Sequence, residues 1–356
     1  MEDIKFMKIA LKLAAQGMGF TEPNPMVGAA AVKDGRIIGA GYHHRFGADH
    51  AERTALKNVT EPGTTLYVTL EPCPHFGKTP PCVDFLLEKK VRRVVTAMLD
   101  PNPLVNGKGV RKLEENGVPV DVGLLSEMAR KLNRHYIKYM TSRMPYVTLK
   151  AGVSLDGKLT DKFRNSRWVT DETMRRLSHS LRGEFSAVMV GVRTAIDDDP
   201  LLNIREPAWG DKKLFRIVLD THNRLDTRLH IFNGDREQFP PVIFSSKEAE
   251  NKTVKVKQHF FVTPGVGGGV DLKEVLAILY QLGIASVLVE GGGGIFNSFL
   301  EEKLYDEIIL AAAGTLIGGK DSVQLFSRGT SVSTPILLKE REITVLESGY
   351  LIRGYR

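Results

Sequence analysis

Cysteine is nearly absent from this sequence, whose 356 residues include only Cys73 and Cys82. Such sparse use of cysteine argues against an oxidising compartment and fits a reducing cytoplasm. Long apolar runs are also missing, since none reaches the roughly 18 residues that a membrane-spanning helix needs. Residues 1–6 are acidic and amphipathic rather than basic and then apolar, so we expect no secretory signal peptide. These absences together favour a cytoplasmic protein.

Blocks of one charge are missing as well. The net charge is +7, but the lysines and arginines are scattered and form no basic tail. This charge fits an anionic partner, either nucleic acid or a phosphorylated metabolite, and it fits a solvated surface of mixed charge equally well. The composition, 42% hydrophobic and 26% charged, is that of a globular protein. The length predicts two domains of roughly 150 residues each.

The two cysteines fall in one stretch that also holds His50, Glu52 and Glu71. It contains His50-Ala51-Glu52, then Glu71-Pro72-Cys73, and finally Cys82. An imidazole and two thiolates bind zinc tetrahedrally and leave a fourth position for water, as in catalytic zinc sites. Bound zinc lowers the pKa of this water from about 15.7 toward about 7. Glu52 lies two residues past a ligand, so we expect it to act on the water as a general acid and base.

This pattern resembles that of zinc-dependent deaminases, which carry His-x-Glu followed by Pro-Cys-x-x-Cys. The spacing differs, because eight residues separate Cys73 from Cys82. We therefore expect Cys73 at the end of a strand and Cys82 at the start of the next helix. Two alternatives stay open, namely inert core cysteines beside a surface histidine, and a disulfide that closes a short loop. The presence of all three ligands together with Glu52 favours the metal site.

The first half of the sequence alternates predicted helices and strands. Residues 27–32 and 37–42 form a hairpin around Asp34-Gly35, and a helix begins near His50. Candidate ligand-binding side chains lie before the first strand or at strand ends, where open α/β sheets bind ligands; they are Asn24, His43, Glu71, Cys73 and Asn102. The other predicted elements are helices at 3–17, 82–90, 107–115 and 126–140 and strands at 64–70, 91–98 and 118–122.

Residues 141–145 form the best domain boundary, because a new alternation of strands and helices begins after them. In the second half, Gly291–Gly294 lies between a strand and a helix, where backbone N–H groups can approach a phosphate; a tight turn is the alternative. Residues 305–355 have alternating apolar runs typical of antiparallel closing strands. The other predicted elements are strands at 146–151, 187–192, 215–219, 242–245, 260–263 and 286–289 and helices at 171–182, 194–200, 272–282 and from about 295.

Short motifs in both halves carry a resemblance to one family. In the first half they are Asn24-Pro25-Met26-Val27-Gly28, His50-Ala51-Glu52, Thr69–Cys73, Gly77–Cys82 and Asp100-Pro101-Asn102-Pro103. In the second half they are Lys150, Ser154–Lys158, Ser166-Arg167-Trp168, Gly191, Thr194, Asp198 and Glu290-Gly291-Gly292. On these motifs the whole chain resembles the bifunctional riboflavin biosynthesis deaminase-reductase family, often called RibD or RibG. The wide cysteine spacing is typical of that family.

The resemblance implies a fold and a function. The fold is α/β, with an N-terminal cytidine-deaminase-like α/β/α domain at 1–144 and a C-terminal dihydrofolate-reductase-like α/β domain at 145–356. The first reaction is zinc-dependent deamination of 2,5-diamino-6-ribosylamino-4(3H)-pyrimidinone 5′-phosphate. The second is NADPH-dependent reduction of 5-amino-6-(5-phosphoribosylamino)uracil to its ribitylamino form. The implied cofactors are Zn²⁺ and NADPH. The implied partners are the phosphorylated pyrimidine and further copies of the chain, without nucleic acid or membrane.

The resemblance also implies roles for individual residues. The zinc ligands are His50, Cys73 and Cys82, and Glu52 is the proton shuttle. The deaminase substrate contacts are Asn24, His43, Lys78 and Asn102. The reductase substrate contacts are Lys150, Ser166, Arg182, Leu202, Arg205 and Glu290. The NADPH contacts are Gly152, Trp168, Thr194, Asp198, Thr221, Gly292, Gly293 and Gly294.

Two other functions remain open at this point. A tRNA or other nucleic-acid deaminase with an appended nucleotide-binding domain shares His-x-Glu and the cysteines, and a positive charge suits it. The wide cysteine spacing and the lack of a recognisable nucleic-acid motif in the second half argue against it. A non-catalytic zinc- or NADPH-binding module is the other alternative. Glu52 argues against that module, because binding zinc does not require this carboxylate.

Overall fold

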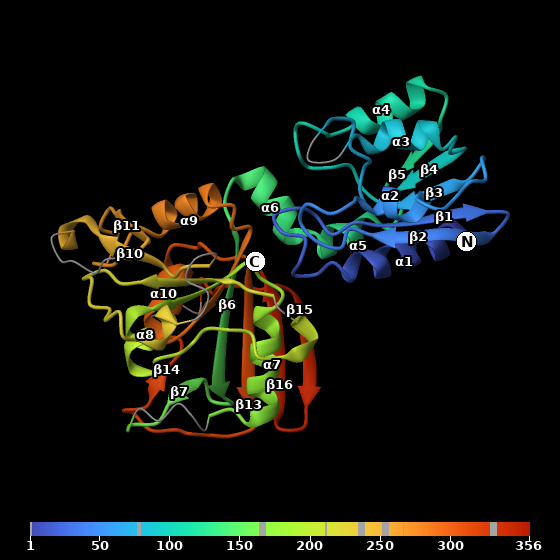
Figure 1. Cartoon of the computed structure of the whole chain (residues 1–356). Helices are drawn as coiled ribbons and strands as arrows, with labels where there is room; N and C mark the ends of the chain where they lie inside the picture. Colours follow the sequence, from blue (N-terminus) through green and yellow to red (C-terminus); the bar gives the residue numbers. More distant parts are fainter. Residues whose placement is uncertain are drawn as a thin grey trace. The chain divides into compact units, whose positions relative to one another are not determined.

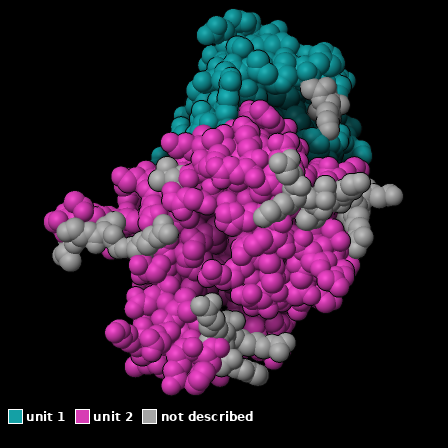
Figure 2. Space-filling view, turned by 90° about the vertical axis from the view of Figure 1, so that its left-hand side faces the viewer, with its two compact units in different colours: residues 1–143 teal, residues 144–356 magenta. Residues whose placement is uncertain are grey.

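The computed structural model of the chain describes residues 2–76, 80–163, 169–210, 212–233, 239–250, 256–265, 267–327 and 333–356. The chain divides into two compact units, Met1–Arg143 and Met144–Arg356, which Figure 2 colours separately. Each unit has a hydrophobic core of its own. Among the residues described, no helix is long and apolar enough to cross a membrane.

The first unit is built on a sheet with the strand order β2-β1-β3-β4-β5. β1 runs antiparallel to both β2 and β3, and β3, β4 and β5 are parallel. α1 and α5 lie on one face of this sheet, and α2, α3 and α4 lie on the other (Figure 1). The strands are β1 (Gly28–Lys33), β2 (Arg36–Tyr42), β3 (Thr65–Val68), β4 (Arg93–Thr96) and β5 (Val120–Val122). The helices are α1 (Glu2–Ala15), α2 (Ala51–Leu56), α3 (Cys82–Glu88), α4 (Lys108–Glu115), α5 (Ser126–Leu132) and α6 (Arg134–Ser142).

Glycines in β2 let α2 lie directly on the sheet. A Cβ added at Gly39 would sit 2.1 Å from the carbonyl oxygen of Ala55, and one at Gly41 would sit 2.6 Å from the Cβ of Thr54. Both contacts are far shorter than side-chain contacts in proteins, so only glycine fits at these positions. The close approach fixes the height of α2 above the sheet, and with it the place of His50 and Glu52 at the start of that helix.

The chain between Ser126 and Ser142 differs from the sequence prediction. The continuous helix predicted over 126–140 is wrong, because the helix is interrupted at Asn133 and continues as α6. Asn133 has φ −100° and ψ 24°, outside the α-helical values. The apolar spacing that predicted one helix continues through this residue, so spacing alone gives no sign of the break.

The second unit is built on a sheet with the order β11-β10-β9-β8-β12-β6-β13-β16-β15. The strands from β11 to β13 are parallel, and β16 and β15 complete the edge antiparallel. The strands are β6 (Tyr146–Ser154), β8 (Ala187–Gly191), β9 (Phe215–Leu219), β10 (Val242–Ser246), β11 (Gln258–Val262), β12 (Ser286–Glu290), β13 (Glu307–Ala313), β15 (Lys339–Leu346) and β16 (Gly349–Tyr355). A separate two-stranded sheet pairs β7 (Lys158–Thr160) with β14 (Val323–Gln324).

Helices cover both faces of this sheet, because alternate strand residues are apolar on each side. Val287 and Met189 pack with α9 and α10, whereas Val188 and Val190 pack on the opposite face with α8. α7 covers the same opposite face over β13 and β16. The helices are α7 (Glu172–Arg182), α8 (Val192–Asp197), α9 (Leu272–Gln281) and α10 (Gly293–Glu301), with 3₁₀ turns η1 (Pro207–Trp209), η2 (His230–Phe232) and η3 (Lys247–Ala249).

The closing strands follow the sequence prediction only in part. β15 and β16 form the expected antiparallel pair, and β13 pairs antiparallel with β16. On its other side β13 pairs parallel with β6, which the prediction for 305–355 did not include. β13 is buried on both faces, so its sequence lacks the alternation that would distinguish a parallel from an antiparallel neighbour.

Candidate functional site

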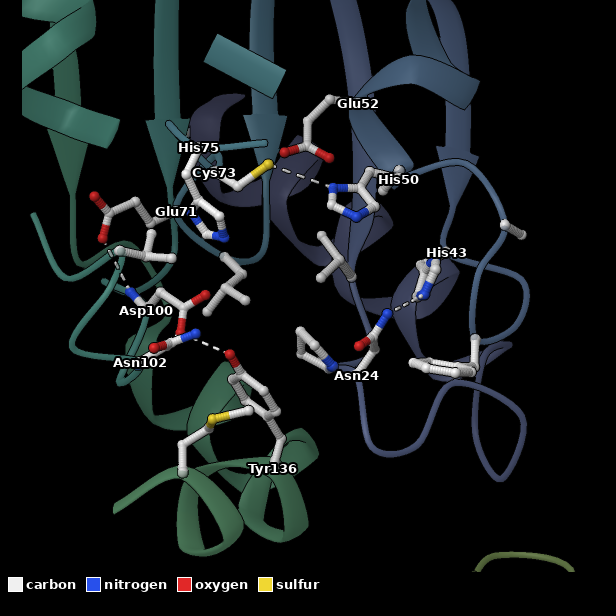
Figure 3. Close-up of a pocket in the computed structure, with 18 of the residues that line it drawn as sticks. Asn24, His43, His50, Glu52, Glu71, Cys73, His75, Asp100, Asn102 and Tyr136 are labelled. Carbon is white, nitrogen blue, oxygen red and sulfur yellow. Dashed lines mark hydrogen bonds between the residues drawn. The ribbon is translucent and has the colours of Figure 1, made fainter. Parts of the chain in front are cut away.

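A cavity of about 320 Å³ lies in the first unit at one edge of the sheet. The chain before β1 and the chain after β2, β3 and β4 all reach this edge, because β1 runs antiparallel to β2 and β3. Figure 3 shows Asn24 and His43 on one side, Asp100 and Asn102 on the other, and His50, Cys73 and Glu52 at one end. The structure therefore brings together the residues that the sequence placed before the first strand, at strand ends and at the start of a helix; those lining the cavity are Asn24, His43, His50, Glu52, Glu71, Cys73 and Asn102.

His50, Cys73 and Cys82 converge at the end of this cavity. Their ligand atoms all lie within 4.8 Å of one another. The Nδ1 atom of His50 lies 3.2 Å from the Cys82 Sγ and 3.6 Å from the Cys73 Sγ. Zinc–sulfur and zinc–nitrogen bonds of about 2.3 and 2.0 Å place two ligands of one tetrahedral ion about 3.5–3.8 Å apart. The donor set and its spacing therefore fit a single zinc ion.

The local backbone explains how eight intervening residues still leave the two cysteines adjacent. Cys82 is the first residue of α3, directly after Pro81. Its backbone N–H donates to the Cys73 sulfur at 3.4 Å, and the next N–H, of Val83, donates to the Cys73 carbonyl at 3.2 Å. His50 immediately precedes α2 with an extended backbone. All three ligands thus stand at a helix start or are held by one.

Burial raises the pKa of both Cys73 and Glu52, but the net shifts of the two groups run in opposite directions. The thiol of Cys82, and then the imidazole of His50, lower the pKa of the Cys73 thiol to about 4, although burial opposes them. Cys73 is therefore ready to bind a metal as a thiolate. Burial raises the pKa of the Glu52 carboxyl, which is 3% exposed. A raised carboxyl pKa suits a group that must both take up and release a proton near neutral pH.

One wall of the cavity is an Asn24–His43 pair. The Asn24 side-chain amide donates to His43 Nε2 at 3.3 Å, and His43 Nδ1 donates to the carbonyl of Asp49 at 3.0 Å. Burial lowers the pKa of His43, so the ring is neutral with its proton on Nδ1. The pair presents hydrogen-bonding groups of fixed orientation and no net charge.

The opposite wall is held by two buried carboxylates. Glu71 accepts four backbone N–H bonds, from Asp100 at 3.1 Å, Gly107 at 2.8 Å, Gly109 at 2.8 Å and Val110 at 3.2 Å. Asp100 accepts in turn from the backbone N–H of Asn102 and from the Tyr136 hydroxyl, both at 2.8 Å. Burial raises the pKa of Asp100 to about 6. The sequence contained Glu71 and Asp100 within motifs, but nothing local indicated Tyr136, which lies on α6.

A second polar cluster lies at the carboxyl end of β12 in the second unit. Glu290 and Arg182 form an ion pair of 2.7 Å with side chains 12% and 11% exposed, and Lys150 pairs in register with Glu290 on the adjacent strand β6. Burial alone would raise the pKa of Glu290, but Arg182 and Lys150 hold it below its usual value. Burial lowers the pKa of Lys150 despite the attraction of Glu290. The cluster is a mostly buried carboxylate beside two basic side chains.

Leu202 and Arg205, two further residues predicted to contact the reductase substrate, lie on either side of Asn203 in the chain, and Asn203 bonds this cluster. The Asn203 carbonyl accepts from Arg182 at 2.9 Å, and its side-chain oxygen accepts from Arg205 at 3.4 Å. Leu202 is buried with a left-handed φ of 50° and packs in the hydrophobic cluster of α8. Lys78, Ser166 and Trp168 lie outside the described residues.

The predicted cofactor residues that the structure describes lie at or near the ends of β6, β8, β9 and β12. Gly291 has φ +136°, and a Cβ there would lie 3.1 Å from the Thr194 hydroxyl of α8. Gly292 precedes α10, and Gly293 and Gly294 form its first turn. Asp198 follows α8, Thr221 follows β9 and accepts from the Ser246 N–H at 3.0 Å, and Gly152 lies on β6. A glycine-rich strand-to-helix connection of this kind suits a phosphate beside the helix start.

Comparison with known proteins gives the family. The RibD C-terminal domain matches residues 145–352, and the cytidine and deoxycytidylate deaminase zinc-binding region matches residues 1–98. The riboflavin biosynthesis protein RibD of Aquifex aeolicus is 44% identical over 318 residues, covering 89% of this chain and 88% of that protein. The Escherichia coli protein of the same name is 37% identical and covers 89% of each chain. This chain belongs to the RibD family.

Solved RibD structures agree over the whole chain. A Thermotoga maritima diaminohydroxyphosphoribosylaminopyrimidine deaminase/5-amino-6-(5-phosphoribosylamino)uracil reductase has a TM-score of 0.88, is 36% identical and covers 99% of this chain and 98% of its own. The Acinetobacter baumannii RibD gives the same TM-score with 34% identity. As a RibD family member, the chain is a bifunctional deaminase and reductase of riboflavin biosynthesis with zinc and NADPH as cofactors. The resemblance inferred from the sequence motifs is confirmed.

Proposed function

We propose that the two activities divide between the two halves of the chain. Residues 1–144 remove the 2-amino group of 2,5-diamino-6-ribosylamino-4(3H)-pyrimidinone 5′-phosphate, and residues 145–356 reduce the ribosyl group of the deaminated product to ribityl. The observation that carries the first assignment is a metal-ligand cluster that opens into a cavity together with a buried carboxyl, Glu52. The second rests on the charged cluster of Glu290 beside a glycine-rich strand-to-helix connection.

In the deaminase, His50, Cys73 and Cys82 would hold the zinc ion, whose charge two thiolates and a neutral imidazole balance. Zinc supplies the acidity that makes water a nucleophile at neutral pH. The carboxylate of Glu52 takes a proton from the attacking water and delivers it to the amino group, which leaves as ammonia. Asn24, His43 and Asn102 orient the pyrimidine ring between the two cavity walls, and Lys78 contacts the ring or the 5′-phosphate.

In the reductase, the charged cluster faces the ribosyl phosphate. Arg182 and Arg205 donate to the 5′-phosphate, for which planar guanidinium groups are suited. Glu290 and Lys150 fix the ribose portion beside the nicotinamide, and Ser166 and Leu202 complete the substrate contacts. NADPH, which supplies the hydride, is held by Gly152, Trp168, Thr194, Asp198, Thr221, Gly292, Gly293 and Gly294.

The chain is further proposed to act as a homo-oligomer in the cytoplasm. Ile343 and Val345 of the edge strand β15 are 65% and 74% exposed, and they share one sheet face with Tyr350 of β16, 39% exposed. An apolar sheet face left open to water suits contact with a second copy. A reducing compartment is required because Cys73 and Cys82 bind zinc only as free thiolates.

Zinc content and the variant Glu52→Gln test the deaminase proposal. The wild type should contain about one zinc per chain and release ammonia from the phosphorylated diaminopyrimidine but not from tRNA. Glu52→Gln should keep the zinc and the reductase activity and lose roughly 10²–10⁴-fold in deamination, the usual contribution of a positioned acid or base.

Glu127→Gln is the matched control, because Glu127 is also the second residue of a helix in the first unit but is exposed. It should deaminate at the wild-type rate. Full zinc retention in Cys73→Ser would contradict the ligand assignment, and normal deamination by Glu52→Gln would remove Glu52 from the mechanism.

A further inference from the structure

The two walls of the deaminase cavity, which carry Asn24 and Asn102, are both held by hydrogen bonds from one short segment where α5 ends and α6 begins. On the Asn24 side, the side-chain oxygen of Asn133 accepts from the Met26 N–H at 2.8 Å, and its amide donates to the Met26 carbonyl at 2.9 Å. Asn133 is 1% exposed and does not line the cavity. His135 adds an ion pair of 2.8 Å to Glu22, two residues before Asn24. The loop that carries Asn24 is therefore held through its backbone by a residue that lies outside the cavity.

On the Asn102 side, the same segment acts through a carboxylate. The Tyr136 hydroxyl donates to Asp100, whose same oxygen accepts the backbone N–H of Asn102. Glu71 fixes the Asp100 backbone from the side of the metal centre. Figure 3 shows Tyr136 reaching this wall from α6, with Asn24 across the cavity.

The helix break at Asn133 belongs to this arrangement. An asparagine at the start of a helix ordinarily uses its side-chain oxygen to cap the first free N–H groups. Here Asn133 makes no side-chain cap to α6, and both ends of its amide bond Met26 instead. The two hydrogen bonds join residues 107 positions apart in the sequence. The side chain therefore serves the Asn24 loop rather than its own helix.

Asn133 and Tyr136, which we call the clamp, lie outside the part of the chain that matches the zinc-binding region of deaminases. The zinc-binding region matches residues 1–98, and the reductase match begins at residue 145. The metal ligands and Glu52 fall inside the first range. Asp100, Asn102, Asn133 and Tyr136 fall between the two. This division separates the machinery of hydrolysis from the residues that shape the far wall of the cavity.

We propose that Asn133 and Tyr136 are positioning residues that set the separation of Asn24 and Asn102, and through it the affinity of the cavity for the pyrimidine ring. The proposal rests on the proposed deaminase function. Because the two asparagines hold the ring before and during the reaction alike, loosening them removes uniform binding, which raises KM and leaves kcat unchanged. A scaffold defect acts differently, because a smaller folded fraction lowers the apparent kcat and leaves KM unchanged.

The test measures deamination by the full-length zinc-loaded chain carrying Tyr136→Phe or Asn133→Ala. Each variant should raise KM for the phosphorylated diaminopyrimidine about tenfold, with kcat within about twofold of wild type. Zinc content and reductase activity should not change. Tyr67→Phe is the matched control, because the Tyr67 hydroxyl also donates to an aspartate, Asp3, in the first unit but away from the cavity. Its KM should equal that of the wild type.

Double variants separate positioning from direct contact with the substrate. In an Asn102→Ala background, Tyr136→Phe should raise KM no further, and in an Asn24→Ala background neither should Asn133→Ala, because residues that act through one partner are not additive. Multiplied effects would overturn the positioning role by showing that Tyr136 itself holds the substrate. A fall in kcat and reductase activity together, at constant KM, would also overturn it. Failure of the wild type to release ammonia would instead refute the deaminase function.

Discussion

At the scale of single residues, two buried glutamates in the same cavity have opposite environments. Glu71 accepts four backbone N–H bonds, so its carboxylate is fully engaged in holding the chain around α4. For Glu52, burial raises the pKa of the carboxyl, and Figure 3 shows this carboxyl group between His50 and Cys73. A group already saturated with hydrogen bonds cannot exchange protons without losing them. The contrast selects Glu52 for proton transfer and Glu71 for the framework.

His179 should make the stability of the second unit depend on pH. Burial, followed by Arg182 and Arg205, lowers the pKa of His179 from 6.5 to about 4. Between these values the unfolded chain binds more protons than the folded chain, so this residue makes stability fall as pH drops from 6.5, and the loss is complete near pH 4. His179→Asn keeps a hydrogen-bond acceptor for Arg182. Between pH 7 and pH 4.5 its melting temperature should therefore fall by less than that of the wild type.

The matched control is His222→Asn, which removes an exposed histidine of the same unit. Its melting temperature should follow the wild-type pH dependence, measured by circular dichroism at each pH. If His179→Asn and the wild type show the same change between pH 7 and pH 4.5, the partly buried position of His179 does not influence stability.

At the scale of elements, the sequence predicts those parts whose cause is local. The β1–β2 hairpin follows from Asp34-Gly35, and Asp34 and Gly35 both adopt the positive φ that such turns require. The positions of His50 and Cys82 at helix starts follow from the flanking residues. The break at Asn133 and the approach of Tyr136 to Asp100 depend on partners more than thirty residues away. No pattern within the segment encodes such a partner, which is why the clamp was not predicted.

The edge formed by β15 and β16 should mediate self-association. Val345 lies opposite Tyr350 and beside Ile343 on the open face of these strands. A lysine at Val345 places a charge in the middle of that apolar face, and burying it against a second copy is unfavourable. Val345→Lys should therefore lower the particle mass measured by sedimentation, with little change in melting temperature.

Thr344→Lys provides the control, because Thr344 is also exposed but points to the opposite face of the same strand. It adds the same charge and should leave the particle mass unchanged. A wild type that sediments as a monomer, or a Val345→Lys chain with wild-type mass, would show that this face is not the contact.

At the scale of the whole molecule, each candidate site is built from residues of one unit. The zinc ligands, Glu52 and the clamp all lie before Arg143, and the Glu290 cluster lies after Met144. Each unit also has its own core, so damage at one site need not spread to the other. The two reactions should therefore be separable by single substitutions in the intact chain.

Glu290→Gln should remove reduction in the same way that Glu52→Gln should remove deamination. Removing the charge leaves the buried Arg182 and the partly buried Lys150 without their carboxylate. Loss of a charge-assisted hydrogen bond of about 1.5–3 kcal/mol should slow reduction by about 10–100-fold. Deamination and zinc content should be unchanged. Circular dichroism must show wild-type folding before the rates are compared.

Mixing the two variants should restore the pathway. Neither Glu52→Gln nor Glu290→Gln alone should turn the diaminopyrimidine into the ribityl product at the wild-type rate. Together, one supplies deaminated intermediate and the other reduces it with NADPH, after a lag that shortens as enzyme concentration rises, because the intermediate must diffuse between molecules. A chain carrying both substitutions, mixed with either single variant, is the control and should not restore the rate. If Glu290→Gln instead loses deamination and keeps reduction, the assignment of the two reactions to the two halves is inverted.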